Sequence, residues 1–358
     1  MESRPQSGPG GSWSVPRGFI VLLGAAGAVV VVAGLKATAG IVGPVFLALM
    51  LTIAASPLGR RLRRAGLPSW LATLATLAAV YLVLVALAAS LALSVARLAT
   101  LLPRYGPKFT ELVDDLRGWL TDLGVGGGQV SAALSDLDLG KLVGFLGDIL
   151  SGLLGLSSNL FLVLALLLFM AMDAARFPER LVEVGGERPA VVTALVAFAR
   201  GTRRYLLVST VFGLIVAVID SGALALLGVP LPLLWGLLAF ITNYIPNIGF
   251  VIGLVPPALL GLLDGGVGTM VAVVAAYSVI NVVIQSVIQP KFVGDAVGLS
   301  VTLTFVSLIF WTWVIGPLGA LLAIPLSLLT KAVLLDIDPS TRWIGALVRG
   351  DGPAKEAP

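Results

Sequence analysis

Four polar side chains recur at every fourth position of one apolar stretch in this chain: Tyr277, Asn281, Gln285 and Gln289. A spacing of four residues places them on one face of a helix. Because amide and phenol groups donate and accept hydrogen bonds, this face could bind a polar solute. The alternative is hydrogen bonding between neighbouring helices, which amides provide in membrane proteins at a modest gain. Four such side chains exceed what packing requires, and we predict that Asn281, Gln285 and Gln289 bind substrate.

A single carboxylate stands inside apolar sequence. Asp220 is the only acid between Tyr205 and Leu263. An ionisable side chain at membrane depth costs about 2.5 to 3.5 kcal/mol on insertion scales, which makes it a functional candidate by default. We predict that Asp220 loads and releases a coupling ion, either a proton or sodium. The alternatives are a hydrogen bond to Ser221 or to a neighbouring helix, or contact with water at the outer interface.

Other chemistry is excluded by missing residue types. The chain has no cysteine and no histidine, which removes disulfides, thiol nucleophiles, imidazole bases and the usual zinc sites. Neither the GxSxG pattern of serine hydrolases nor the GxxxxGK[ST] pattern of nucleotide-binding proteins is present. We therefore expect no catalytic residues, no metal site and no cofactor. The protein is not expected to be an enzyme.

The composition predicts an integral membrane protein. Hydrophobic residues make up 58% of the chain, charged residues only 12%, and the mean hydropathy is +1.04, whereas soluble chains carry about a quarter charged residues. The net charge of +4 is small, and the basic residues lie beside apolar runs. This pattern predicts a lipid bilayer and not a nucleic acid as the partner.

Uncharged runs and basic loops predict the topology. A helix needs roughly 20 apolar residues to cross a bilayer. Uncharged runs of about this length or longer cover 18–35, 37–59, 68–96 and 149–172. The arginine-rich "GRRLRRAG" after the second run indicates a cytoplasmic loop. We expect the protein to lie in the plasma (inner) membrane, with both termini cytoplasmic. The expected division is a disordered cytoplasmic tail (1–17), three N-terminal spans (18–100), an external amphipathic helical segment (101–148), a fourth span (149–172), a cytoplasmic amphipathic segment (173–204), a core (205–335) and a cytoplasmic tail (336–358). The external segment is either an outer gate or a pair of helices at the interface.

Two later apolar runs are too long for one straight span. Residues 232–263 and 299–330 would each reach about 45 Å as a helix. Each run is interrupted, by "YIPNIG" in the first and by "VIGPLG" in the second. Proline removes a backbone donor and glycine favours a bend. Each run is therefore predicted to form a re-entrant helical hairpin.

The two runs are also related by an internal repeat. Gly228, Phe240, Thr242, Ile245 and Gly249 recur 70 residues later as Gly298, Phe310, Thr312, Ile315 and Gly319. A unit of one span plus one hairpin inverts on duplication, as in several secondary transporters. The predicted fold is therefore an all-α integral membrane protein with about eight membrane segments, its C-terminal half built from two inverted units. This arrangement would put Asp264 outside and Lys291 inside.

Interrupted helices at membrane depth also predict a binding site, because unwound backbone is tolerated there only when it is buried in protein or lines a watery cavity. We expect both turns to meet near the membrane midplane. The predicted binding residues besides the polar face of 277–289 are Asn243, Pro246, Asn247, Gly249, Thr312, Gly316, Pro317 and Gly319.

The segments "GVPLPLLWGLLAFITNYIPNIGFVIGLVPPALL", "VIQPKFVGDAVGLS" and "FWTWVIGPLGALLAIPLSLLTKAVL" resemble the signature regions of the autoinducer-2 exporter family of permeases. The resemblance covers residues 201–335. It implies an all-helical permease and homo-oligomers such as pentamers, with some members assigned export of autoinducer-2 and others Na⁺/H⁺ antiport. The expected function is secondary-active export of a small polar molecule. The alternatives are a Na⁺/H⁺ antiporter and, more distantly, an intramembrane scaffold.

Overall fold

The computed structural model describes residues 16–122, 139–246, 248–289 and 300–338, and the regular elements within these ranges are all helical. Within these ranges, five helices are long and apolar enough to cross a membrane, or up to six if a bent pair within 161–187 forms one span. Shorter apolar helices accompany them at Val21–Ala37, Pro232–Thr242 and Val301–Ile315. The prediction of an all-α membrane protein is confirmed, while the number of eight membrane segments stays a prediction.

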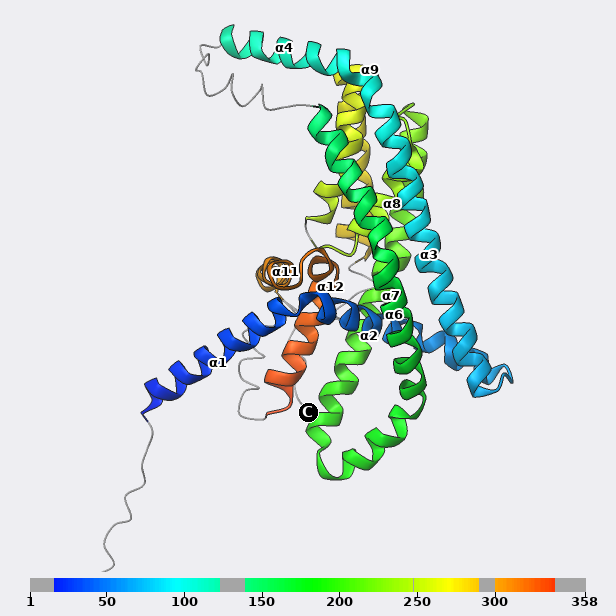
Figure 1. Cartoon of the computed structure of the whole chain (residues 1–358), viewed down its shortest axis with the longest axis vertical. Coiled ribbons are helices and arrows are strands. Elements are labelled where there is room, and N and C mark those ends of the chain that lie inside the picture. Colours follow the sequence, from blue (N-terminus) through cyan, green and yellow to red (C-terminus); the bar gives the residue numbers. More distant parts are fainter. Residues whose placement is uncertain (1–15, 123–138, 247, 290–299, 339–358) are drawn as a thin grey trace, which may run out of the picture.

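The N-terminal half begins with α1 (Arg17–Ala37), α2 (Ala39–Arg64) and α3 (Ser69–Leu101), followed by the short η1 (Leu102–Tyr105) and by α4 (Gly106–Asp122). Helix α3 rises along the bundle and α4 turns across its upper end, whereas α1 extends away from the lower half (Figure 1). The expected fourth span is the middle of a longer helix, α6 (Leu139–Glu187), which bends by 54° between Phe161–Ala174 and Arg176–Glu187.

The C-terminal half contains α7 (Pro189–Leu226), α8 (Pro232–Thr242), α9 (Gly249–Asn281) with the π-helical η2 (Val282–Ile288), α11 (Val301–Ile315), and α12 (Pro317–Lys331) with the π-helical η4 (Ala332–Asp336). Helix α9 consists of two arms, because the chain reverses at Gly266, whose φ of 77° lies in the left-handed region. The arms pack against each other, since a Cβ added at Gly261 in the first arm would lie 3.4 Å from Val273 in the second.

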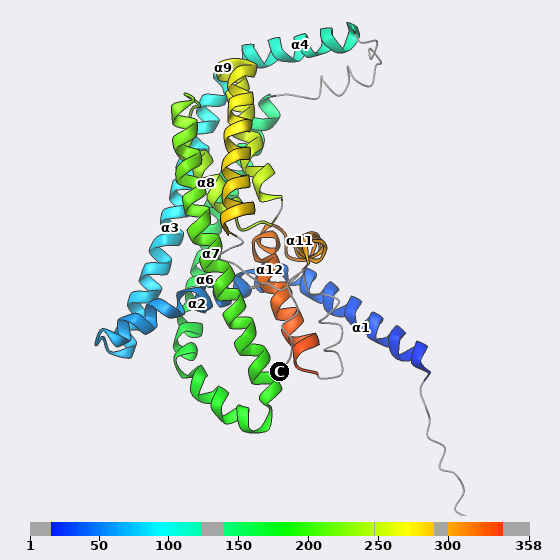
Figure 2. The same ribbon diagram turned by 180° about the vertical axis from the view of Figure 1, so that it is seen from behind.

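Both long apolar runs are interrupted where the sequence predicts. Residues 243–248 separate α8 from the first arm of α9, and Gly316, with φ 80°, separates α11 from α12. Trp311 Nε1 donates a 3.1 Å hydrogen bond to Ser327 Oγ, which holds α11 against α12. Helix α7 runs up the bundle and the second arm of α9 runs down it (Figures 1 and 2). This opposed direction is what two inverted units require.

The repeat extends to the backbone packing of the two turns. A Cβ added at Gly249 would collide with the Thr242 carbonyl, and one at Gly319, its partner in the repeat, would collide with the Trp311 carbonyl. Residues of both turns also belong to one hydrophobic cluster, in which Ile245 and Ile248 of the first turn pack with Ile315 and Leu318 of the second. The two turns therefore lie in the same region of the molecule, and they share an apolar contact.

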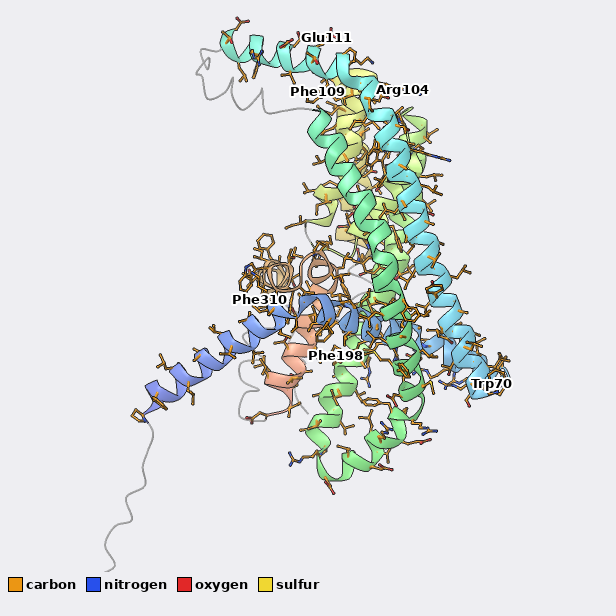
Figure 3. All side chains as sticks on the ribbon, viewed as in Figure 1. Trp70, Arg104, Phe109, Glu111, Phe198 and Phe310 are labelled. Atoms are coloured by element: carbon orange, nitrogen blue, oxygen red, sulfur yellow. The ribbon has the colours of Figure 1, made fainter. Side chains whose placement is uncertain are left out.

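At the end of the bundle where α4 begins, a hydrophobic cluster that includes Leu98, Leu102 and Leu260 connects α3 and η1 to the first hairpin. Tyr105 Oη donates a 2.7 Å hydrogen bond to Asp264, and Lys108 Nζ donates a 3.2 Å bond to the Asp264 carbonyl. Asp264 thus lies at the end of the bundle where α4 begins, near the labelled Arg104 and Phe109 (Figure 3). A straight span over 232–263 would have carried Asp264 to the opposite end. The first half of α4 packs on this cluster through Phe109 and Leu112, whereas Trp119 further along α4 is 60% exposed.

The close contact between α7 and α8 provides a test of the packing. A Cβ at Gly236 in α8 would lie 2.7 Å from the Ala217 carbonyl oxygen of α7. Gly236→Ala is therefore expected to lower the free energy of unfolding by about 1–3 kcal/mol, the usual cost of overpacking. Thermal unfolding of the purified protein in detergent would measure this change.

Gly222→Ala on α7 is the matched control, since nothing lies within 4 Å of a Cβ at that position. It should leave the melting temperature unchanged or raise it slightly, because alanine favours helix over glycine. Equal melting temperatures for the Gly236 variant and the control would contradict the close approach of α7 and α8.

Candidate functional site

The turn between α8 and α9 is tied to one side of α7. Asn243 Nδ2 donates a 2.8 Å hydrogen bond to the Ser209 carbonyl. The Tyr244 hydroxyl shares a 2.6 Å hydrogen bond with Thr210 Oγ1, and Tyr205 Oη donates a 2.8 Å bond to the Tyr244 carbonyl. Three side-chain hydrogen bonds therefore hold the unwound segment in place, as backbone away from water requires.

A second set of hydrogen bonds connects this turn to the second arm of α9 and to η2. Gln285 Nε2 donates to Asn281 Oδ1 at 2.7 Å and lies 3.4 Å from Asn243 Oδ1. Asn281 Nδ2 in turn donates to the Tyr277 carbonyl at 2.9 Å. Gln285 stands in a π-helical turn, a distortion that is frequent at functional sites. The amides thus form one chain from α9 to α7.

These side chains border a small cavity between α7, α8 and both arms of α9. Its described lining residues are Val216, Asp220, Ala239, Thr242, Asn243, Gly249, Phe250, Gly253, Tyr277, Asn281 and Gln285. In this conformation the cavity has room for little more than one water molecule. It is thus large enough for water or a bare ion and too small for an organic solute.

Two buried polar groups face this cavity without a protein partner. Asp220 is 0% exposed and Tyr277 is 1% exposed. Neither carboxylate oxygen of Asp220, nor the Tyr277 hydroxyl, has a hydrogen-bond partner among the described residues. Leaving such groups unpaired costs about 1–3 kcal/mol each. Asp220 is also the only acid among the described residues that line the cavity. A proton, a water molecule or a cation that enters the cavity would therefore bind at Asp220 and Tyr277.

Several predicted site residues meet here and others do not. The cavity brings together Asp220, Asn243, Gly249, Asn281 and Gln285. Gln289, one turn beyond Gln285, does not line it, and neither does Pro246 in the turn. Thr312, Gly316, Pro317 and Gly319 all lie on the second hairpin, away from the cavity lining. Asn247 lies outside the described residues.

Hydrogen bonding within the protein is shown for the middle residues of the polar face of 277–289, whereas substrate binding by them stays a prediction. Asn281 and Gln285 hydrogen-bond within the protein and also line the cavity. The alternative that Asp220 bonds Ser221 is wrong for this structure, because its oxygens have no partner among the described residues. Contact of Asp220 with water at the outer interface is equally excluded by its complete burial.

Sequence reasoning did not identify the residues that hold the turn. Tyr205, Ser209 and Thr210 form a polar group on α7, and Tyr244 follows Asn243 in the turn. Only their position in the sequence could have indicated this role, because the polar residues of 205–210 precede an apolar run that contains a single acid. Nothing in that pattern tells which helix they would contact.

Comparisons with known proteins identify the family. Residues 20–338 match the family described as AI-2E family transporter. The chain is 31% identical to the protein YhhT of Escherichia coli (strain K12) over 314 residues, which are 88% of this chain and 90% of YhhT. It is 30% identical to the AI-2 transport protein TqsA of the same strain over 316 residues, which are 88% of this chain and 91% of TqsA.

The unpartnered carboxylate leads to a stability prediction. Asp220→Leu is expected to leave the free energy of unfolding unchanged or to raise it by up to about 1–3 kcal/mol, because it removes a buried polar group that has no partner. Asn243→Leu is the matched comparison, since it breaks the 2.8 Å bond to Ser209, and it should lower the free energy of unfolding by about 1–3 kcal/mol. Thermal unfolding in detergent measures both. Equal destabilisation by the two variants would show that Asp220 has a structural partner.

Proposed function

Because the chain belongs to the AI-2E transporter family, we propose that it is a secondary-active permease that exports a small polar molecule, autoinducer-2 or a related metabolite. The chain is a transporter and not an enzyme, in keeping with its family. It lacks a nucleotide-binding motif of the form GxxxxGK[ST]. An ion gradient is therefore the energy source that this proposal assigns to it.

The observation that carries the proposal is the polar cavity at the interrupted hairpin. Asn243, Asn281 and Gln285 supply amide donors and acceptors there, in a bundle whose spans are otherwise apolar. Amides on unwound or π-helical backbone can bind hydroxyl and carbonyl groups of a polar solute. The turn is joined to α7 by side-chain hydrogen bonds rather than by continuous helix. Its displacement from α7 would enlarge the cavity enough to admit such a solute.

A cation/proton antiporter is the second candidate, and one observation favours it. The cavity has room for little more than one water molecule, and the buried, unpartnered Asp220 faces it. A carboxylate with amide and phenol oxygens around it is a set of ligands that suits a hard cation. Asp220 serves both candidates, since it would couple the export of a solute to an ion or would carry the ion itself.

The membrane, the orientation and the assembly complete the proposal. We propose the plasma (inner) membrane, with the arginine-rich end of α2 and both termini cytoplasmic, by the positive-inside rule. We also propose a homo-oligomer, of which a pentamer is one form. The wide apolar faces support both lipid and subunit contacts, as on α7, where Leu214 is 57% exposed and Val218 is 64% exposed.

The amide cluster gives the first functional prediction. Asn281→Leu and Gln285→Leu should each reduce efflux of autoinducer-2 at least tenfold, because each removes a polar group worth about 1.4 kcal/mol or more to a bound solute. Efflux would be measured from preloaded proteoliposomes under an imposed proton or sodium gradient. Val279→Leu is the control, since Val279 lies on the same helix and is 62% exposed. Unchanged efflux in both variants would show that the two amides make structural hydrogen bonds only.

Ion coupling gives the second functional prediction. Asp220→Asn keeps the shape of the side chain and removes its charge, so uphill transport should be lost while downhill exchange persists. The measurement compares efflux with and without imposed proton and sodium gradients. A variant that still drives uphill efflux with the wild-type dependence on both gradients would disprove the coupling role. Sodium-dependent proton movement by the wild type, with no organic solute present, would favour the antiporter.

A further inference from the structure

A second cavity, larger than the polar cavity described above, lies where α2, α3 and α6 meet. It is separate from the polar cavity described above and shares no lining residue with it. Its lining includes residues from the arginine-rich end of α2 and from the first turns of α3, and Trp70 marks the start of α3 in Figure 3. The family likeness and the proposed transport site leave this cavity without a role.

The cavity lining contains both cationic and apolar side chains. Helix α2 contributes Arg60 and Arg63, and the apolar lining residues include Val80 of α3 and Leu167 of α6. No acidic side chain is present among the described lining residues. Such a surface suits a ligand that is anionic at one end and apolar at the other.

The two arginines have no partner of their own. Neither Arg60 nor Arg63 makes a side-chain hydrogen bond or an ion pair within the part of the chain that the structure describes. The lining hydroxyls differ in this respect, because each donates to a carbonyl of its own helix, as Thr76 Oγ1 does to Ala72 at 2.7 Å. The unused hydrogen-bond donors of the cavity are therefore the guanidinium groups.

Arg63 points into the cavity rather than away from it. A Cβ added at Gly59 would lie 3.9 Å from Arg63 Nη2 and 3.2 Å from Thr76 Oγ1 of α3. The guanidinium therefore lies over Gly59, on the side of α2 that faces α3, and the Arg63 side chain is half-buried. A larger residue than glycine at 59 would fill this space.

A third guanidinium adds to the positive charge. Arg203 of α7 donates from Nε to the Ile53 carbonyl of α2 at 3.3 Å and lies within electrostatic range of Arg60. Like charges gathered at a helix end repel one another, and a bound anion would offset that repulsion. The planar fork of arginine matches the oxygens of a phosphate group with two parallel hydrogen bonds.

We propose that this cavity is a phosphate-binding site, formed by Arg60 and Arg63, for the headgroup of an anionic phospholipid whose acyl chain lies along Val80 and Leu167. Basic pockets between membrane helices bind such headgroups through the same chemistry. A soluble phosphate compound would use the same two guanidinium groups, and the experiment separates these two sources of phosphate.

The test compares two double variants of the full-length protein in detergent. Arg60→Gln with Arg63→Gln removes both cavity guanidiniums. Arg61→Gln with Arg64→Gln removes the same charge from the same helix end, but neither of those side chains lines the cavity. Native mass spectrometry would count bound phosphatidylglycerol, with phosphatidylcholine as the neutral lipid. We expect the first variant to lose phosphatidylglycerol affinity about tenfold or more and the second to keep it.

The second arm uses inorganic phosphate and glycerol phosphate, titrated by calorimetry into the protein in phosphatidylcholine nanodiscs. Binding of these probes that depends on Arg60 and Arg63, without selective binding of phosphatidylglycerol, would assign the site to a soluble phosphate. Size-exclusion profiles establish that both variants are folded. The proposal is overturned if neither phosphatidylglycerol nor either phosphate compound binds, or if both double variants lose binding equally.

Discussion

The structure depends on one constraint, which is that interrupted backbone inside an apolar bundle must find its hydrogen bonds within the protein. The turn between α8 and α9 meets it in two ways. The N–H groups of Asn243 and Ile245 donate to the Ala239 and Thr242 carbonyls, so the turn satisfies part of itself. The Tyr244 carbonyl accepts from Tyr205 of α7. Without these partners each unpaired group would cost several kcal/mol in hydrocarbon.

The same hydrogen bonds create the candidate site. Asn243 donates to α7 through its nitrogen and faces Gln285 through its oxygen, so one side chain both holds the turn and lines the cavity. Any movement of the turn would change the set of polar groups around Asp220. Under the proposed function, stability and ligand binding would thus depend on the same few amides. An ion or a solute that competes for them would shift the position of the hairpin.

The repeat has produced two hairpins with different chemistry. The first turn spans 243–248, carries polar side chains and borders the polar cavity. The second is reduced to Gly316, and its neighbours Ile315 and Leu318 pack in an apolar cluster with Ile245 of the first turn. The shared cluster joins the hairpins mechanically, while the hydrogen-bonding groups belong to one of them. In agreement with this difference, the described lining of the polar cavity includes Asn243 and Gly249 of the first hairpin and no residue of the second.

Composition and local pattern determined the membrane class, the helical fold, the two interrupted runs and the polar face of α9, because each depends only on residues close in sequence. The signature segments likewise identified the family. Tertiary packing decided which polar groups meet. Helices that are apolar all round carry no amphipathic signal to tell which face turns inward, so the sequence could not place Asp220 beside Tyr277 and away from Thr312. Nor could it distinguish Arg60 and Arg63 from their neighbours, since only the contact of α2 with α3 and α6 selects that face.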